Sequence, residues 1–241
     1  MTPVSIFGRD LREVTLFVST PNVLLGTTST YFLLPSDFTA MPHIFFSSQL
    51  NKHVVDALLD AGVLAVSCSS GSTWQTADRD VVRWPADSIA DLLRRGFVPV
   101  LHGDCALDAK LGICILSGDT IIKTLCARFC VKRVVFLTDV AGVYDRPPTD
   151  KGARLLPHIS VRPDGSVKLD INTSQSEHDV TGGIRLKLQT AVDIVRQTCG
   201  KCAVVVCRVD SPGVFDVCRN GDVVKDLELT VVAMEDTTLT S

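Results

Sequence analysis

The sequence predicts an α/β fold built on an open, mostly parallel sheet with helices on both faces. Short apolar runs, typical of buried strands, alternate along the chain with segments whose apolar residues recur at helical spacing. Of the 241 residues, 46% are hydrophobic and 21% are charged, which is close to the average of globular domains. Most of the chain is therefore expected to fold around a sizeable core.

The helices and strands can be assigned in order from residue 48 onward. Leu50, Val54 and Leu58 recur at helical spacing and predict a helix over residues 49–61. Further helices are predicted over residues 87–95, from the turn at residues 117–119 to about residue 130, and over residues 184–198 and 214–219. Buried strands are predicted at residues 63–66, 134–137 and 203–206, and further strands at 97–101, 111–116, 155–159, 167–171 and 227–233. Residues 68–79, rich in Ser, Gly and Thr, are expected to form a loop.

Residues 1–47 do not follow this alternation. Apart from a predicted strand at residues 14–18, they form a stretch rich in Ser, Thr, Pro and Phe. We therefore predict an atypical N-terminal segment, residues 1–47, followed by one α/β domain, residues 48–241.

Charge and hydropathy exclude several classes of function. Lys and Arg total 24 against 27 Asp and Glu, and no basic block stands out, so no nucleic-acid partner is expected. No apolar run approaches the ~20 residues of a membrane helix. Arg9 and Asp10 lie where a signal peptide would be apolar, so we expect a cytoplasmic protein without membrane contact.

The cysteines favour a reducing compartment. There are nine of them, an odd number, and several lie inside apolar runs, as buried free thiols do. Cys199 and Cys202 have the spacing of a metal or redox pair. A single pair is more typical of structural cysteines than of zinc or redox chemistry, so no metal site is predicted.

Three polar turns lie where an open α/β sheet binds its ligands, outside the carboxyl ends of the strands. They are residues 102–104 (HGD), 138–139 (TD) and 181–183 (TGG). His102 could act as a base, or it could only hydrogen-bond the backbone. Asp139 could position a nucleotide or a metal-bound water, or it could only cap a turn.

Two predicted helix starts suit anionic ligands. At the first, Ser117 or Asp119 could cap the helix, or the backbone at Gly118 could hold a phosphate. At the second, Gly183 belongs to a tight glycine turn, and Lys187 lies one helical turn further on. Lys187 could reach phosphate oxygens, or it could be a surface lysine with a buried stem. The dinucleotide pattern Gly-x-Gly-x-x-Gly and the P-loop pattern do not occur in the sequence.

Taken in order, these turns resemble the motifs of the amino acid kinase superfamily, and within it most closely those of the isopentenyl phosphate kinase family. The matching segments are residues 102–104 (HGD), 115–119 (ILSGD), 136–145 (FLTDVAGVYD) and 179–183 (DVTGG) with Lys187. The resemblance covers roughly residues 48–233. It implies a three-layer αβα sandwich with an open, mostly parallel sheet, usually assembled as a homodimer.

The resemblance also implies a reaction. The family transfers the γ-phosphoryl group of ATP to isopentenyl phosphate in isoprenoid biosynthesis (the alternative mevalonate route), giving isopentenyl diphosphate and ADP. Mg²⁺ is expected to bind through the ATP phosphates. The acceptor oxygen is already anionic near neutral pH, so catalysis needs positioning and charge neutralisation rather than a strong general base. Carried over by motif, the substrate phosphate contacts are Gly118 and Asp119, and the ATP contacts are Thr138, Asp139, Gly183 and Lys187, with Lys187 also catalytic.

Residues 1–47 depart from the family pattern. Family members open with a strand carrying Lys and a Gly-Gly-Ser turn, followed by a Gly-x-Gly-Ser-Phe-Gly-His turn whose His contacts the substrate phosphate. This sequence has no Gly-Gly pair before Gly182, so the family's first βαβ portion is expected to be missing or replaced. Two alternatives therefore stand beside the kinase hypothesis. One is a catalytically deficient relative that retains partial nucleotide binding. The other is a superfamily kinase for another acceptor, such as fosfomycin, acetylglutamate or a nucleoside monophosphate.

Overall fold

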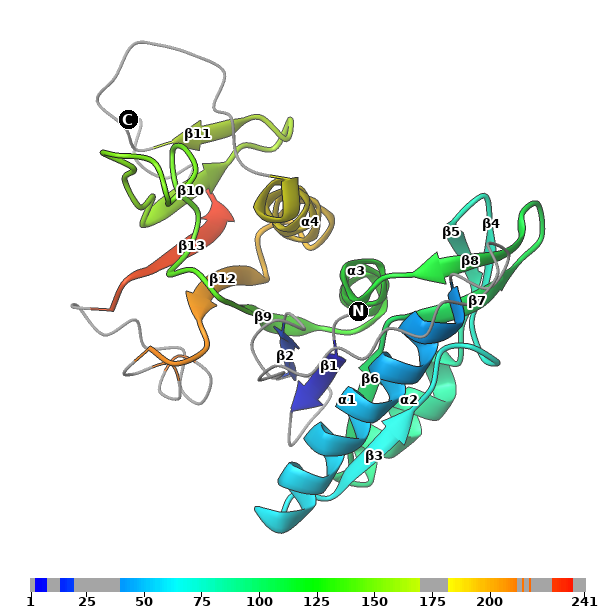
Figure 1. Cartoon of the computed structure of the whole chain (residues 1–241). Coiled ribbons are helices and arrows are strands. Elements are labelled where there is room, and N and C mark those ends of the chain that lie inside the picture. The colour runs from blue at the N-terminus through cyan, green and yellow to red at the C-terminus, as the bar shows by residue number, and fades with distance from the viewer. Residues whose placement is uncertain are drawn as a thin grey trace. The chain divides into compact units, whose positions relative to one another are not determined.

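A computed structural model describes residues 3–7, 14–19, 40–169, 182–211, 214, 217 and 227–235. The contacts divide the chain into two compact units, Met1–Cys130 and Val131–Ser241 (Figure 1). The predicted division into residues 1–47 and 48–241 stays a prediction.

The first unit contains a mixed sheet in which every residue of one inner strand is buried. Its strands lie in the order β2 (Val14–Ser19), β1 (Pro3–Phe7), β6 (Val98–His102) and β3 (Ala65–Cys68). Strand β1 is antiparallel to β2 and β6, whereas β3 and β6 are parallel. Three helices pack on these strands: α1 (Ala40–Asp60), α2 (Ala86–Arg94) and α3 (Gly118–Arg128). Since α1 and α2 both contact β6, all five residues of that strand are buried.

Helix α1 is held on the sheet by an apolar face and one buried amide. Val54, Val55 and Leu58 pack against a cluster of buried residues on β3 and β6, namely Ala65, Val98 and Val100. The Asn51 side chain donates to the carbonyl of Val100 at 3.1 Å and accepts from the Ser67 hydroxyl at 2.6 Å. The periodicity of these residues predicted the helix correctly, although its first residue is Ala40 rather than residue 49.

A second sheet of the first unit corrects the predicted loop over residues 68–79. Its strands lie in the order β5 (Asp80–Arg83), β4 (Gln75–Ala77), β7 (Asp104–Asp108) and β8 (Gly112–Leu116). The β4–β5 connection is the two-residue turn Asp78-Arg79, whose φ angles are 55° and 70°. Such turns usually carry Asn or Gly, and this one carries neither, so the sequence gives no hairpin signal.

The carboxylate of Asp108 stabilises this unusual turn. It accepts hydrogen bonds from the backbone N–H groups of Asp78 at 3.0 Å and Arg79 at 2.8 Å. The N–H groups of Lys110 and Leu111 and the Thr76 hydroxyl donate to the same carboxylate. Burial raises the pKa of Asp108, but these hydrogen bonds together lower the pKa by more than burial raises it. The pKa therefore lies well below the ordinary Asp range.

We expect Asp108→Asn to lower the free energy of unfolding at neutral pH, because an amide nitrogen cannot accept the bonds that one carboxylate oxygen accepts. The depressed pKa makes this loss complete above about pH 5, and the two proteins should converge as the pH falls below about 4, where the unfolded chain binds the proton first. Urea denaturation across this pH range measures it. The control is Asp80→Asn, at an exposed position on β5. Equal stability of Asp108→Asn and wild type at pH 7 would contradict the role of Asp108.

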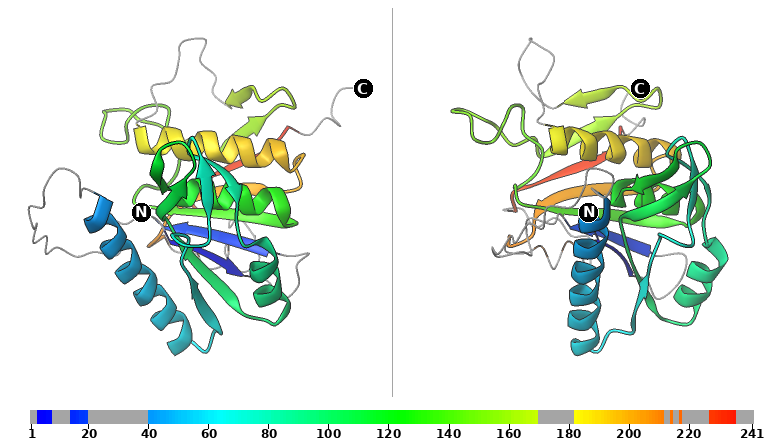
Figure 2. Two further views of the ribbon diagram at one scale, coloured as in Figure 1. Left: turned by 90° about the vertical axis from the view of Figure 1, so that its right-hand side faces the viewer. Right: turned by 45° about the vertical axis from the view of Figure 1, so that its right-hand side comes forward.

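The second unit contains a mixed sheet covered by helix α4 (Gly182–Gln197). Its strands lie in the order β11 (Val167–Leu169), β10 (His158–Val161), β13 (Leu229–Met234), β12 (Ala203–Arg208) and β9 (Val131–Thr138). The pairs β9–β12 and β10–β13 are parallel, and β12–β13 and β10–β11 are antiparallel. Helix α4, the yellow helix in Figure 2, contacts β10, β12 and β13. Val134, Val135 and Phe136 are almost fully buried, which accounts for the continuous apolar run that predicted β9.

The α/β class is confirmed, and parallel pairs occur in both units. Of the helix predicted at 214–219, only Val214 and Val217 are described, and both are helical. The turn at residues 179–181 lies outside the described residues. Within the described ranges, no helix combines the length and apolar character that a membrane span requires.

Candidate functional site

The carboxyl ends of β9 and β12 lie side by side in the second unit. Thr138 ends β9 and pairs with Arg208, the last residue of β12. The Val209 N–H donates to the Thr138 carbonyl at 3.1 Å, which extends the parallel pairing by one residue. The Thr138 hydroxyl is buried and donates to the carboxylate of Asp139 at 3.0 Å. Asp139 itself is exposed, so a carboxylate stands at the edge of the sheet, oriented by a hydroxyl on the strand.

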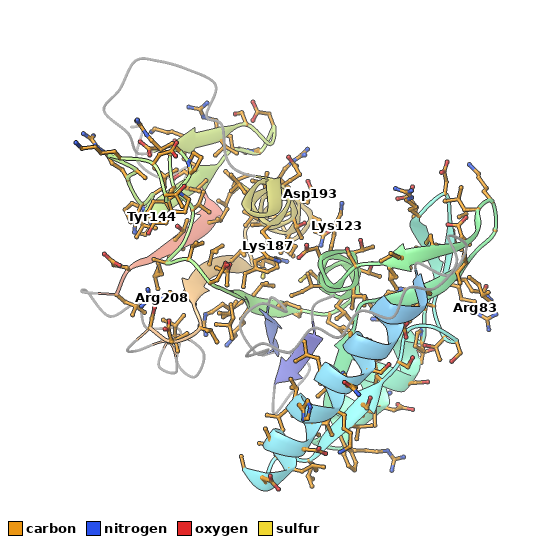
Figure 3. All side chains as sticks on the ribbon, in the orientation of Figure 1. Arg83, Lys123, Tyr144, Lys187, Asp193 and Arg208 are labelled. Atoms are coloured by element: carbon orange, nitrogen blue, oxygen red, sulfur yellow. The ribbon has the colours of Figure 1, made fainter. Side chains whose placement is uncertain are left out.

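Helix α4 brings Lys187 onto β9. The Lys187 side chain, labelled in Figure 3, is 7% exposed. Its Nζ lies 5.1 Å from the centroid of the Phe136 ring. This placement contradicts the alternative of an ordinary surface lysine. Phe136 and Thr138 are two residues apart on one strand, so their side chains project from the same face. The ammonium group of Lys187 therefore lies on the face of β9 that ends at Thr138.

The other predicted phosphate contact of this unit is in the first turn of the same helix. Helix α4 begins at Gly182, and Gly183 is its second residue. The first N–H groups of a helix have no partner within the helix and carry its positive dipole end. Gly183 and Lys187 lie one turn apart. They thus provide a partly positive backbone N–H and a positively charged ammonium group.

The segment after Asp139 is anchored to the loop over residues 146–155. The Asp145 N–H donates to the Arg154 carbonyl at 3.0 Å, and the Arg154 N–H donates to the Asp145 carboxylate at 2.9 Å. This backbone N–H, more than the neighbouring Arg146 guanidinium, holds the pKa of Asp145 below its ordinary value. Asp145 therefore stays ionised at neutral pH, and its carboxylate stabilises the loop rather than transferring a proton.

In the first unit, Gly118 and Asp119 are the first two residues of α3. Ser117 is the N-cap, and its hydroxyl accepts from the Thr120 N–H at 3.1 Å, so the capping prediction is confirmed. The cap bonds the N–H of Thr120 and not that of Gly118, and the phosphate contact predicted at Gly118 stays a prediction. His102 is 3% exposed, and its Nδ1 lies 3.0 Å from the Gly103 carbonyl, which supports the backbone-bonded interpretation over that of a base.

Thr138, Asp139, Gly183 and Lys187 thus belong to the second unit, and Gly118 and Asp119 to the first. Sequence reasoning missed Arg208, which is labelled in Figure 3. It lies beside Thr138 and forms an ion pair with Asp210 at 2.6 Å. The predicted strand at 203–206 stopped two residues short; extending it to the first charged residue would have found Arg208. Within the described residues, no group of three or more His, Cys, Asp or Glu side chains could hold a metal ion.

Comparisons with known proteins point to one family. The profile of the Amino acid kinase family matches residues 46–208. An isopentenyl phosphate kinase from Arabidopsis thaliana is 41% identical over 162 residues, which are 62% of this chain and 49% of that protein. One from Methanothermobacter thermautotrophicus is 37% identical over 145 residues, which are 58% of this chain and 53% of that protein. The chain spans about half the length of the curated relatives it matches.

The fold comparison agrees. A solved structure described as "X-ray structures of isopentenyl phosphate kinase" superposes with a TM-score of 0.65 at 26% identity, covering 81% of this chain and 70% of that chain. A Thermoplasma acidophilum isopentenyl phosphate kinase structure, 23% identical with a TM-score of 0.58, shares the fold. The family profile covers about two thirds of the chain, including every predicted site residue from Gly118 to Lys187, and the chain therefore belongs to the amino acid kinase family.

Proposed function

We propose that this chain is a small-molecule kinase of the isopentenyl phosphate kinase type, which converts isopentenyl phosphate and ATP to isopentenyl diphosphate and ADP. The observation that carries the proposal is the position of Lys187, whose buried ammonium lies over Phe136 on the face of β9 that ends at Thr138. The similarity to isopentenyl phosphate kinases at up to 41% identity supports the choice of acceptor.

In the proposed reaction, an oxygen of the acceptor phosphate attacks the γ-phosphorus of ATP. One P–O bond forms, the bond to the β-phosphate bridging oxygen breaks, and ADP leaves. The acceptor oxygen carries its charge already, so no residue has to remove a proton. The chain's task is to hold two anionic groups in line and to neutralise them. Lys187 and the N–H groups near Gly183 would act on the ATP phosphates, and the start of α3 at Gly118 and Asp119 would act on the acceptor phosphate.

Thr138 and Asp139 are proposed to bind on the nucleotide side. Mg²⁺ in phosphoryl-transfer sites is commonly bound by one or two carboxylates together with substrate phosphates and water. Asp139 offers one exposed carboxylate at the end of β9, which fits a metal ion held mainly through ATP. When bound, Mg²⁺ would supply neutralisation of the phosphate charge.

The test is an assay of the full chain with ATP, Mg²⁺ and isopentenyl phosphate, with mass spectrometry of the product. We expect isopentenyl diphosphate, formed only when all three components are present. A panel with acetylglutamate, fosfomycin and a nucleoside monophosphate separates the acceptors within the family. A sample that unfolds cooperatively and binds ATP, yet makes no phosphorylated product from any acceptor, would show a nucleotide-binding relative instead of a kinase.

We also propose a cytoplasmic location and a homodimer. The location is supported by the eight cysteines of the described ranges, all of which are free thiols. The dimer is supported by the family resemblance, and light scattering of the purified chain measures it.

A further inference from the structure

The loop that follows Thr138 and Asp139 is fixed by a residue far along the chain. Thr230 lies on β13, where it is almost fully buried and pairs with Val206 of β12. Its hydroxyl oxygen accepts a hydrogen bond from the Val143 N–H at 2.8 Å, across 87 residues of sequence. Val143 is also buried, so this N–H has no access to solvent and depends on the hydroxyl.

The same hydroxyl fits against a glycine of the loop. A Cβ atom on Gly142 would lie 2.4 Å from Thr230 Oγ1, 2.9 Å from the Thr230 backbone nitrogen and 3.0 Å from Leu155 Cδ1. The first two distances are too short for real atoms, and one of them is to backbone that cannot move aside. Gly142 is therefore required for close approach of the loop to β13.

The loop is also held by residues 155 and 156. The Leu156 N–H donates to the Val143 carbonyl at 2.8 Å, and Tyr144 forms a bridge with Leu155. At its beginning, the loop is fixed where the Val209 N–H donates to the Thr138 carbonyl. Residues 139–145 are thus anchored at Thr138 and again at Val143, and the Thr230 hydroxyl supplies the contact from β13.

We infer that Thr230 is a positioning residue for the nucleotide side of the site: it fixes the path of residues 139–145 and so the place of Asp139. This inference rests on the proposed function for its nucleotide part, because Thr138 and Asp139 are the proposed ATP contacts. Thr230 is buried beneath the loop and acts through it, so it is expected to affect ATP and not the acceptor.

The test compares Thr230→Val, Thr230→Ser and Val232→Ala in the full chain. Thr230→Val keeps the shape of the side chain but removes the acceptor of the Val143 N–H. We expect it to raise the KM for ATP roughly three- to tenfold, with the KM for isopentenyl phosphate unchanged. Thr230→Ser keeps the hydroxyl and should restore the KM for ATP to within about twofold of wild type. Val232→Ala destabilises β13 at another fully buried position and should leave both KM values unchanged.

Amide hydrogen exchange provides a readout that does not need activity. In Thr230→Val, exchange over residues 139–145 should become faster, and in Val232→Ala it should remain at the wild-type rate over that segment. An unchanged KM for ATP in an active Thr230→Val protein would overturn this inference and leave the proposed function standing. An equal rise of the KM for ATP in Val232→Ala would do the same. If wild type makes no product, the proposed function and the nucleotide part fail together, and unchanged exchange would then also overturn the positioning of the loop.

Discussion

Replacing Lys187 by alanine is expected to lower ATP-dependent turnover at least about tenfold, because a charge-assisted contact to the transferring phosphates is lost. Lys187 is buried against Phe136, so alanine would also remove packing. Lys187→Met separates the two effects, since it keeps an unbranched apolar side chain over the ring and removes only the charge. We expect Lys187→Met to unfold at the same denaturant concentration as wild type, within the error of the measurement, and to be nearly as inactive as Lys187→Ala.

The matched control is Lys201→Ala, at an exposed position in the turn after α4. It removes one positive charge from the same unit and should leave turnover unchanged. Steady-state rates at saturating ATP and isopentenyl phosphate, with urea denaturation of each protein, complete the comparison. Full turnover by Lys187→Met would remove Lys187 from the catalytic site and leave it as a packing residue.

The second large effect is expected on stability. Gly142→Ala should lower the free energy of unfolding by about 2 kcal/mol or more, because the added methyl group would meet Thr230 Oγ1 at 2.4 Å and the Thr230 nitrogen at 2.9 Å. The loop has to move away from β13 to accommodate it. Binding of ATP should weaken at the same time, since Asp139 lies three residues before Gly142. Denaturant unfolding and titration with ATP measure the two effects.

Gly152→Ala is the control for this substitution. Gly152 has φ +86° and nothing within 4 Å of an added Cβ. Alanine there should lower the free energy of unfolding by about 1 kcal/mol, through backbone strain only. The cost of Gly142→Ala should also shrink in a Thr230→Ala background, where the nearest of the clashing atoms is absent. Equal costs at positions 142 and 152 would mean that the contact with Thr230 does not constrain the loop.

The strands and helices that carry the site could be predicted because each depends on neighbours in sequence. The strand predicted at residues 134–137 and the helix predicted after the turn at residues 117–119 are both present, as β9 (Val131–Thr138) and α3 (Gly118–Arg128), and each was predicted from residues close to it in sequence. The hairpin β4–β5 could not be predicted, since its Asp78-Arg79 turn is stabilised by the carboxylate of Asp108, about thirty residues away. A local pattern contains no trace of such a partner.

By itself, the sequence determined the α/β class, the order of the motifs and the chemistry of the predicted site residues. Only the tertiary structure decided that Lys187 is buried over Phe136 and that Arg208 lies beside Thr138. It also decided that the Thr230 hydroxyl accepts a hydrogen bond from the Val143 N–H. Secondary structure follows from apolar spacing over a few residues, which the sequence displays directly. Contacts between strands and loops depend on the register in which distant segments pair, and that register is fixed only when the whole sheet buries its apolar faces together.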